Sequence, residues 1–140
     1  MQPSRRDLAL LLPVVAAAQE KKAPTLESKV YRYEDLPVKV NGENKGRAVL
    51  NGVTHGGFPV ELHMTELGPG QAPHAPHQHA HEEIVMLRRG SLDVTIEGKT
   101  TRMTVGSVTS VASGQMHGWR NAGSEPAEYF VIALGPEPRR

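Results

Sequence analysis

At 140 residues, with 38% hydrophobic and 22% charged residues, the chain has the composition of one folded domain rather than of a disordered segment. It contains no cysteine, which excludes disulfides, iron–sulfur clusters, thiolate zinc sites and a cysteine nucleophile. Its 16 basic and 15 acidic residues nearly balance, so we expect neither nucleic acid nor an anionic membrane surface as a partner.

The N-terminus predicts an export signal over residues 1–18. A pair of arginines precedes the apolar run 8–15, and three alanines ending at Ala18 form a cleavage site. The run is far shorter than the ~20 residues that cross a bilayer, so no membrane span is expected. The arginine pair resembles a bacterial twin-arginine signal, which predicts a periplasmic or secreted protein. Asp7 departs from that pattern, so the Sec route stays open, as does an amphipathic first helix.

The remaining chain predicts a short arm and one all-β domain. Residues 19–29 are polar and read as a linker or arm, and residues 30–136 form the expected barrel domain. Short apolar runs alternate with Gly, Pro and Asn, without helical periodicity, and turn signals recur as in a sandwich or barrel. The expected strands are 47–50, 60–67, 84–87, 92–97, 100–105, 108–111, 117–120 and 127–134.

Side chains alternate along the expected strand 60–67. It places Val60, Leu62 and Met64 on one face and Glu61, His63 and Thr65 on the other. The role of His63 stays open between contact with a site or substrate inside a barrel and a hydrogen-bonded core histidine.

A cluster of histidines predicts a metal site, because four of the seven histidines fall within residues 74–81. His77 and His79 are two residues apart, which puts both imidazoles on one face of an extended chain. Glu83 would be about 13 Å from His79 if the chain were straight, whereas each ligand atom lies ~2.0–2.2 Å from a bound ion. The chain must therefore bend across residues 80–82. His81 and Glu82 remain alternatives to Glu83 as the ligand.

A further ligand must come from another part of the chain, and the only histidine after this cluster is His117. His74 and His81 are expected at the surface or beside the ligands rather than on the metal. Trp119, two residues beyond His117, is expected in the core, and Asn121 is expected to fix the turn after its strand.

Two spaced motifs resemble those of the cupin superfamily. The first motif has glycine, a short spacer, His-x-His, a glutamate and a second glycine, here Gly70, His77, His79, Glu83 and Gly90. The spacer after Gly70 is one residue longer than the common form.

The second cupin motif is matched by Gly106, Gly114, His117 and Asn121 at the expected offsets. Ala112 replaces the usual proline, a change expected to loosen that turn without touching a ligand. The two motifs together span residues 70–121.

The resemblance implies a double-stranded β-helix, the cupin jelly-roll barrel. It implies that His77, His79, Glu83 and His117 bind one divalent transition metal: Mn, Fe, Ni, Cu, Co or Zn. It also implies a small-molecule ligand or substrate and a homodimer, formed through an N-terminal strand or an outer sheet, with residues 30–40 as a contributor.

The motifs leave the reaction open among three classes. An oxygenase would act on a small substrate that chelates the metal with adjacent oxygen atoms. An isomerase or lyase would instead move a proton on a polarised carbonyl compound. A non-catalytic barrel would only bind a sugar or a small acid. The motifs identify no catalytic residue.

Overall fold

The computed structural model describes residues 23–135, so the expected export signal 1–18 and residue 136 of the expected barrel lie outside the described residues. No helix among the described residues is long and apolar enough to cross a membrane. The elements are one 3₁₀ turn, Tyr33–Asp35, and strands β1 Val38–Asn41, β2 Asn44–Val53, β3 Pro59–Leu67, β4 Glu82–Arg89, β5 Leu92–Ile96, β6 Lys99–Met103, β7 Val108–Val111, β8 His117–Arg120 and β9 Ala127–Leu134.

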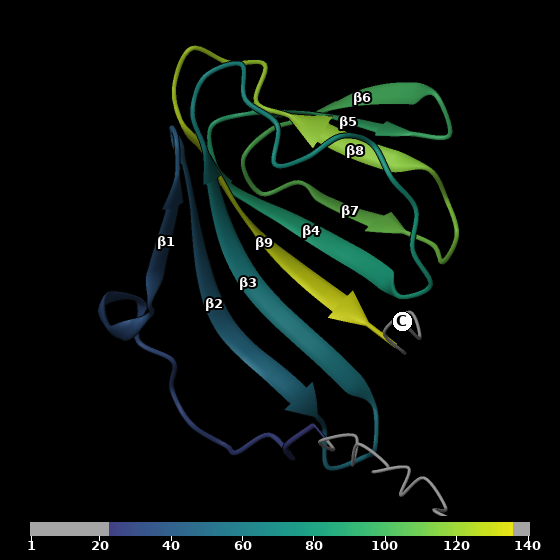
Figure 1. Cartoon of the computed structure of the whole chain (residues 1–140). Helices are drawn as coiled ribbons and strands as arrows, with labels where there is room; N and C mark the ends of the chain where they lie inside the picture. The colour runs from purple at the N-terminus through teal and green to yellow at the C-terminus, as the bar shows by residue number, and fades with distance from the viewer. Residues whose placement is uncertain (1–22, 136–140) are drawn as a thin grey trace, which may run out of the picture.

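Two antiparallel sheets face each other in a jelly-roll double-stranded β-helix, which confirms the expected fold class (Figure 1). The larger sheet has the order β1-β2-β3-β9-β4-β7, and the smaller has the order β6-β5-β8. The last strand, β9, lies between β3 and β4, which are separated in sequence by a long loop.

The inner face of the larger sheet carries buried core residues together with several polar side chains, and its outer face is apolar. Val131 on β9 is opposite His63 on β3 and Val85 on β4, and both valines are buried in the core. Directly opposite residues in antiparallel strands share a face, so the row containing Glu61, His63 and Thr65 points into the barrel. The apolar row with Leu62 and Met64 points away from it.

The smaller sheet contributes a hairpin at the place predicted for the residues between the two motifs. Strands β5 and β6 are joined by Glu97 and Gly98, which have φ values of 47° and 79°. Positive φ at both central residues is the conformation of tight hairpin turns, where glycine is favoured. Buried side chains from both sheets, including Leu92, Met103 and Tyr129, meet in one core.

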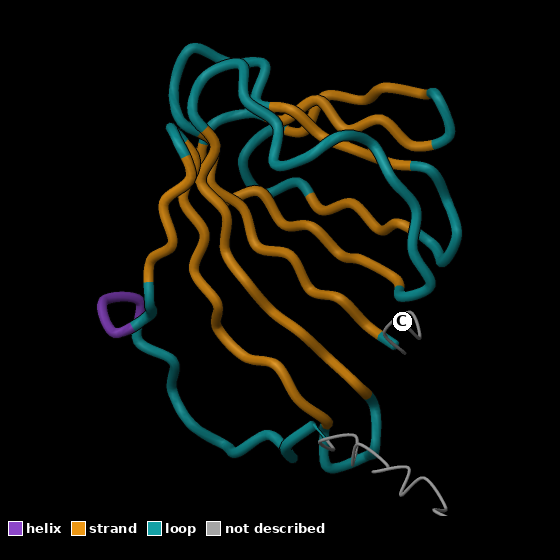
Figure 2. The backbone as a smooth tube through the Cα atoms, viewed as in Figure 1, coloured by secondary structure: helices purple, strands orange, loops and turns teal. Residues whose placement is uncertain are grey.

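Residues 68–81 form a loop that connects β3 to β4 and passes the open side of β8 (Figure 2). Residues 77–79 therefore lie in a loop rather than in a regular strand; only His77 forms a bridge, with His117. The expected bend before Glu83 is present at Ala80 and His81, just where β4 begins. The expected strand 47–50 is part of a longer strand, β2, that also pairs with β1.

Residues 24–26, within the expected arm, are attached to the end of β2. The Leu26 N–H donates to the Val53 carbonyl, and the Val53 N–H donates to the Pro24 carbonyl. A side chain at Gly52 would clash with this segment, because an added Cβ would lie 2.4 Å from the Pro24 carbonyl oxygen.

Candidate metal centre

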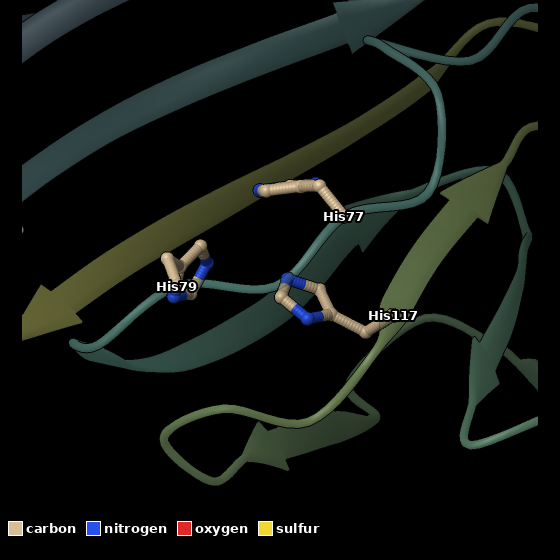
Figure 3. A group of neighbouring side chains, drawn as sticks. All are labelled: His77, His79 and His117. Atoms are coloured by element: carbon tan, nitrogen blue, oxygen red, sulfur yellow. The ribbon is translucent and has the colours of Figure 1, made fainter.

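Three histidines from two distant parts of the chain converge inside the mouth of the barrel. His77 and His79 project from the loop before β4, and His117 projects from the first residue of β8 (Figure 3). Their ring centroids are 4.7 to 5.0 Å apart. Backbone bonds hold the two segments together, because the N–H of each of His77 and His117 donates to the carbonyl of the other at 2.9 Å.

Backbone carbonyls fix the orientation of two of these rings. Nδ1 of His79 lies 2.8 Å from the carbonyl oxygen of His81, and Nδ1 of His117 lies 2.8 Å from that of Gln115. A carbonyl can only accept a hydrogen bond, so Nδ1 carries the proton in each ring and Nε2 is left with a free lone pair. A metal-binding imidazole usually donates its other ring N–H to a hydrogen-bond acceptor in this way.

The turn before His117 is held by its own hydrogen bond. The N–H of Ala112, where the motif usually has proline, donates to Oε1 of Gln115 at 3.1 Å. Proline has no N–H, so this bond is available only because the residue is not proline. The turn that supplies the carbonyl of Gln115 is therefore closed by a side chain rather than by a proline ring.

Glu83 adds a carboxylate from the start of β4. Its Oε1 lies 3.2 Å from Nε2 of His79, and its Oε2 lies 3.3 Å from Nε2 of His117. The neighbouring Val85 and Leu87 are core residues, so Glu83 points inward with them, whereas Glu82 is exposed.

His81 lies against the same group. Its ring stacks on that of His79 with centroids 3.6 Å apart, and its Nε2 lies 3.4 Å from Oε1 of Glu83. Two sets of side chains in the described residues can hold a metal ion: His77, His79 and His117 form one, and His79, His81 and Glu83 form the other. The two sets share His79. They also touch where Glu83 of the second set lies 3.3 Å from Nε2 of His117 in the first.

Four buried polar side-chain atoms among the described residues have no hydrogen-bond partner. They are Nδ1 of His77, Nε2 of His79, Oε2 of Glu83 and Nε2 of His117. The short distances from Glu83 to His79 and His117 do not have hydrogen-bond geometry. Leaving a buried polar group unpaired costs about 1–3 kcal/mol, so proteins rarely gather four of them in one place. The chemistry of these imidazole and carboxylate donors fits a cation.

The electrostatic surroundings of His77 favour its neutral form. Burial lowers the pKa of His77 below its ordinary value of 6.5, and the nearby His74, His117 and His79 lower it further. The carboxylate of Glu83 acts in the opposite direction. A neutral imidazole is the form that binds a metal, so burial prepares this side chain for ligation.

Aromatic residues support His117 from the core side. Its ring stacks on Trp119 with centroids 5.7 Å apart, and the indole N–H donates to the hydroxyl of Tyr129 at 2.8 Å. Burial raises the pKa of Tyr129, so its hydroxyl stays neutral. Trp119 is in the core, as expected, and Asn121 holds the turn after β8, also as expected.

The other histidines differ in their surroundings. His74 is exposed and touches the ring of His77 edge-on, with centroids 4.2 Å apart. His63 lies on the inner face of β3, where its Nδ1 is 2.9 Å from a carboxylate oxygen of Glu61. Sequence reasoning gave no role to Glu61, although its position two residues before His63 on a strand already placed the two side chains on one face.

A family model described as "Cupin domain" matches residues 63–133, which is just over half of the chain. No curated protein matches the chain in sequence.

Several solved structures have a similar fold, although their sequence identity to this chain is low. The chain is similar to KdgF from Halomonas sp., with a TM-score of 0.65 and 18% identity over 81% of this chain and 96% of that one. It is similar to the polyketide cyclase RemF from Streptomyces resistomycificus, with a TM-score of 0.66 and 18% identity over 81% and 83% of the two chains. An RmlC-like cupin from Shewanella frigidimarina gives a TM-score of 0.63 and 16% identity over 75% and 88%.

At these identities the solved structures establish the fold alone. The family model covers β4 to β8 and with them His77, His79, Glu83 and His117. Taken with the jelly-roll topology, this match shows that the chain belongs to the cupin domain family.

Proposed function

We propose that His77, His79, Glu83 and His117 bind one divalent transition metal, drawn from Mn, Fe, Ni, Cu, Co and Zn. The observation that carries this proposal is the convergence of four buried, unpaired donor atoms, one from each of these residues. Imidazole and carboxylate together suit these ions. His81 supports the site by accepting the Nδ1 proton of His79 with its carbonyl and by lying beside Glu83.

We propose that the protein is a metal-dependent enzyme of the oxygenase type that acts on a small chelating substrate. When bound, the metal would supply Lewis acidity and open positions for substrate oxygen atoms and dioxygen. The chain's own residues would orient the ligands through the carbonyls of His81 and Gln115 and would keep His77 neutral. An isomerase or lyase is the alternative, favoured by the carboxylate–imidazole pair of Glu61 and His63 on the inner face of β3.

The reaction class can be tested with iron-loaded protein and a panel of α-hydroxyketones, β-diketones and catechols. We expect dioxygen uptake that depends on one of these substrates and disappears in the His117→Ala variant. Exchange of substrate C–H protons with deuterated water, without dioxygen uptake, would instead identify an isomerase or lyase. Tight binding of a panel member without either reaction would identify a binding barrel.

Metal affinity should depend on pH, because the histidines must be neutral to bind. The ordinary histidine pKa is ~6.5, so we expect affinity to be steady near pH 8 and to fall below about pH 6.5. Because the pKa of His77 is lowered, this side chain should become protonated only at a lower pH than an ordinary histidine. Competition with a chromophoric chelator between about pH 8 and about pH 5 measures this. The exposed His55→Gln variant should give an unchanged profile, and a pH-independent affinity would contradict imidazole ligation.

The same pKa shift predicts the pH dependence of the metal-free protein. A histidine whose pKa is lower when folded binds protons more readily when unfolded. The free energy of unfolding of the metal-free protein should therefore decrease as the pH falls below about 6.5. Above that pH, His77 should make no pH-dependent contribution to stability.

We further propose a homodimer formed through the apolar outer face of the larger sheet. Leu62, Ile132 and Ile84 lie in one row across β3, β9 and β4, and Phe130 and Met86 lie in the next. We expect Ile132→Lys to dissociate the dimer, as measured by light scattering during size-exclusion chromatography. Thr100→Lys, an exposed position on the face of β6 that points away from the core, is the matched control. A monomeric wild-type protein would exclude the dimer.

We also propose export to the periplasm or beyond, with cleavage near Ala18, supported by the paired arginines and the short apolar run. Replacing both arginines with lysine should retain the protein in the cytoplasm if export follows the twin-arginine route. Unchanged export of that variant would indicate the Sec route, and a cytoplasmic wild-type protein would exclude a signal.

A further inference from the structure

A cavity of about 790 Å³ lies beside His81, a neighbour of the proposed metal donors. It is bounded by the segment at Pro24, the end of β2 and the start of β3, and its walls include Glu61, His81 and Ala133. His81 connects it with the donor set, because Nε2 of His81 lies 3.4 Å from Oε1 of Glu83. The cavity therefore borders the donor set at His81, the wall residue that lies against Glu83.

Strand register places Glu61 and Glu83 on either side of Ala133, which lines the cavity. Both residues are directly opposite Ala133, Glu61 from β3 and Glu83 from β4, so all three side chains point into the barrel. Two strand spacings separate the glutamate backbones by about 10 Å. The side chain between them is only a methyl group, which leaves room for a small molecule that reaches from one carboxylate to the other.

Glu61 is a prepared hydrogen-bond acceptor rather than a freely rotating surface carboxylate. Both of its oxygens lie close to Nδ1 of His63, at 2.9 and 3.1 Å. About one third of each side chain is exposed, so the carboxylate is oriented and remains reachable from the cavity. Most of the remaining wall is apolar, including Pro24, Val53 and Val60.

We propose that this cavity is the substrate site and that Glu61, positioned by His63, recognises a hydroxyl group at the end of the substrate remote from the metal. The inference rests on the proposed metal site, which would hold the oxygen donors at the other end. The substrate class is therefore a small acid or carbonyl compound with an apolar middle and a terminal hydroxyl. The hydroxyl donates its hydrogen bond to the Glu61 carboxylate.

The test uses full-length protein loaded with Zn²⁺, which is diamagnetic, and matched pairs of ligands followed by NMR titration. Each pair is a fatty acid and its terminally hydroxylated form: propanoate, butanoate and pentanoate against the corresponding hydroxy acids. At one chain length we expect the hydroxy acid to bind on the order of tenfold more tightly, as for a hydrogen bond to a charged group.

Variants then assign that preference to the pair of residues. Glu61→Leu should abolish it, and Glu61→Gln, which keeps an oxygen but loses the charge, should reduce it. His63→Gln retains an N–H donor and should preserve most of the preference, whereas His63→Leu should lower it. Glu125→Gln, at an exposed loop position, is the control and should bind as wild type does.

The outcomes separate this inference from the function on which it rests. Binding of both members of every pair with equal affinity, or a preference that survives Glu61→Leu, overturns the role of Glu61. Zn²⁺ binding without binding of any acid overturns the cavity as a substrate site and leaves the metal site standing. Failure to bind Zn²⁺, iron or any of the other proposed ions overturns the metal site and this inference together.

Discussion

Replacing His117 with alanine is expected to abolish stoichiometric metal binding. His117 is 1% exposed, and its Nε2 is one of the four unpaired donor atoms. His117 also links β8 to the loop before β4 through its two backbone hydrogen bonds with His77. Loss of an outer partner of a metal ligand weakens binding by about 10–100-fold, so loss of a ligand itself should cost at least about 100-fold. Metal content by mass spectrometry, on protein purified without a tag, measures this directly.

Two further variants make that result specific to ligation. His117→Gln fills most of the space of the histidine side chain. Metal loss in this variant as well would therefore reflect the missing ligand and not an empty space in the core. His55→Ala changes a histidine in an exposed turn and should retain the full metal content. Unchanged metal content in His117→Ala would exclude the proposed four-residue site and leave His79, His81 and Glu83 as the set to test.

Replacing Asn121 with alanine is expected to cause the largest loss of stability. This side chain is fully buried, and its Nδ2 lies 2.8 to 3.1 Å from the carbonyl oxygens of Leu67, Gly68 and Glu125. Its Oδ1 accepts the N–H of Gly123 at 2.9 Å. Each buried group left unpaired costs about 1–3 kcal/mol, which predicts a total loss on the order of 4 kcal/mol. Urea unfolding monitored by fluorescence of Trp119 would measure it.

That loss is large against the 5–15 kcal/mol that typically stabilises a domain, so the variant should be near its unfolding threshold at moderate temperature. Ser124→Ala, an exposed position in the same turn, should change stability by less than about 0.5 kcal/mol. A loss below about 1 kcal/mol in Asn121→Ala would mean that water replaces the missing amide and that this turn is not a buried anchor.

Local patterns predicted most of the strands because alternation and turn residues act over a few positions. The predicted ranges 108–111, 117–120 and 127–134 coincide with β7, β8 and β9, and 60–67 differs from β3 by one residue. Motif spacing indicated which histidines meet, and the structure does bring His77, His79 and His117 together. Assignment of Glu83 as a ligand stays a prediction, and His81 is the neighbour that competes with it.

Other features depended on contacts between distant segments and were not predictable from local pattern. The β1–β2 pairing was missed because β1 is short and exposed throughout, with no alternating burial to mark it. The loop conformation of residues 77–79 depends on backbone bonds to His117, forty residues along the chain from His77. The partner of His63 was open because either a core contact or a site contact fits its place on β3; the structure supplies Glu61.

The position of β9 between β3 and β4 has a consequence for the order in which the chain folds. Until residues 127–134 leave the ribosome, both neighbouring strands lack a partner along a whole edge. The larger sheet therefore cannot close before β9 is available, and the pairs that β9 makes with β3 and β4 join residues 39 to 74 positions apart. Such non-local pairing slows folding and leaves strand edges open to aggregation in the meantime. A nascent chain that ends before β9 should thus be a strong chaperone client, and protease resistance should appear only once β9 has left the ribosome.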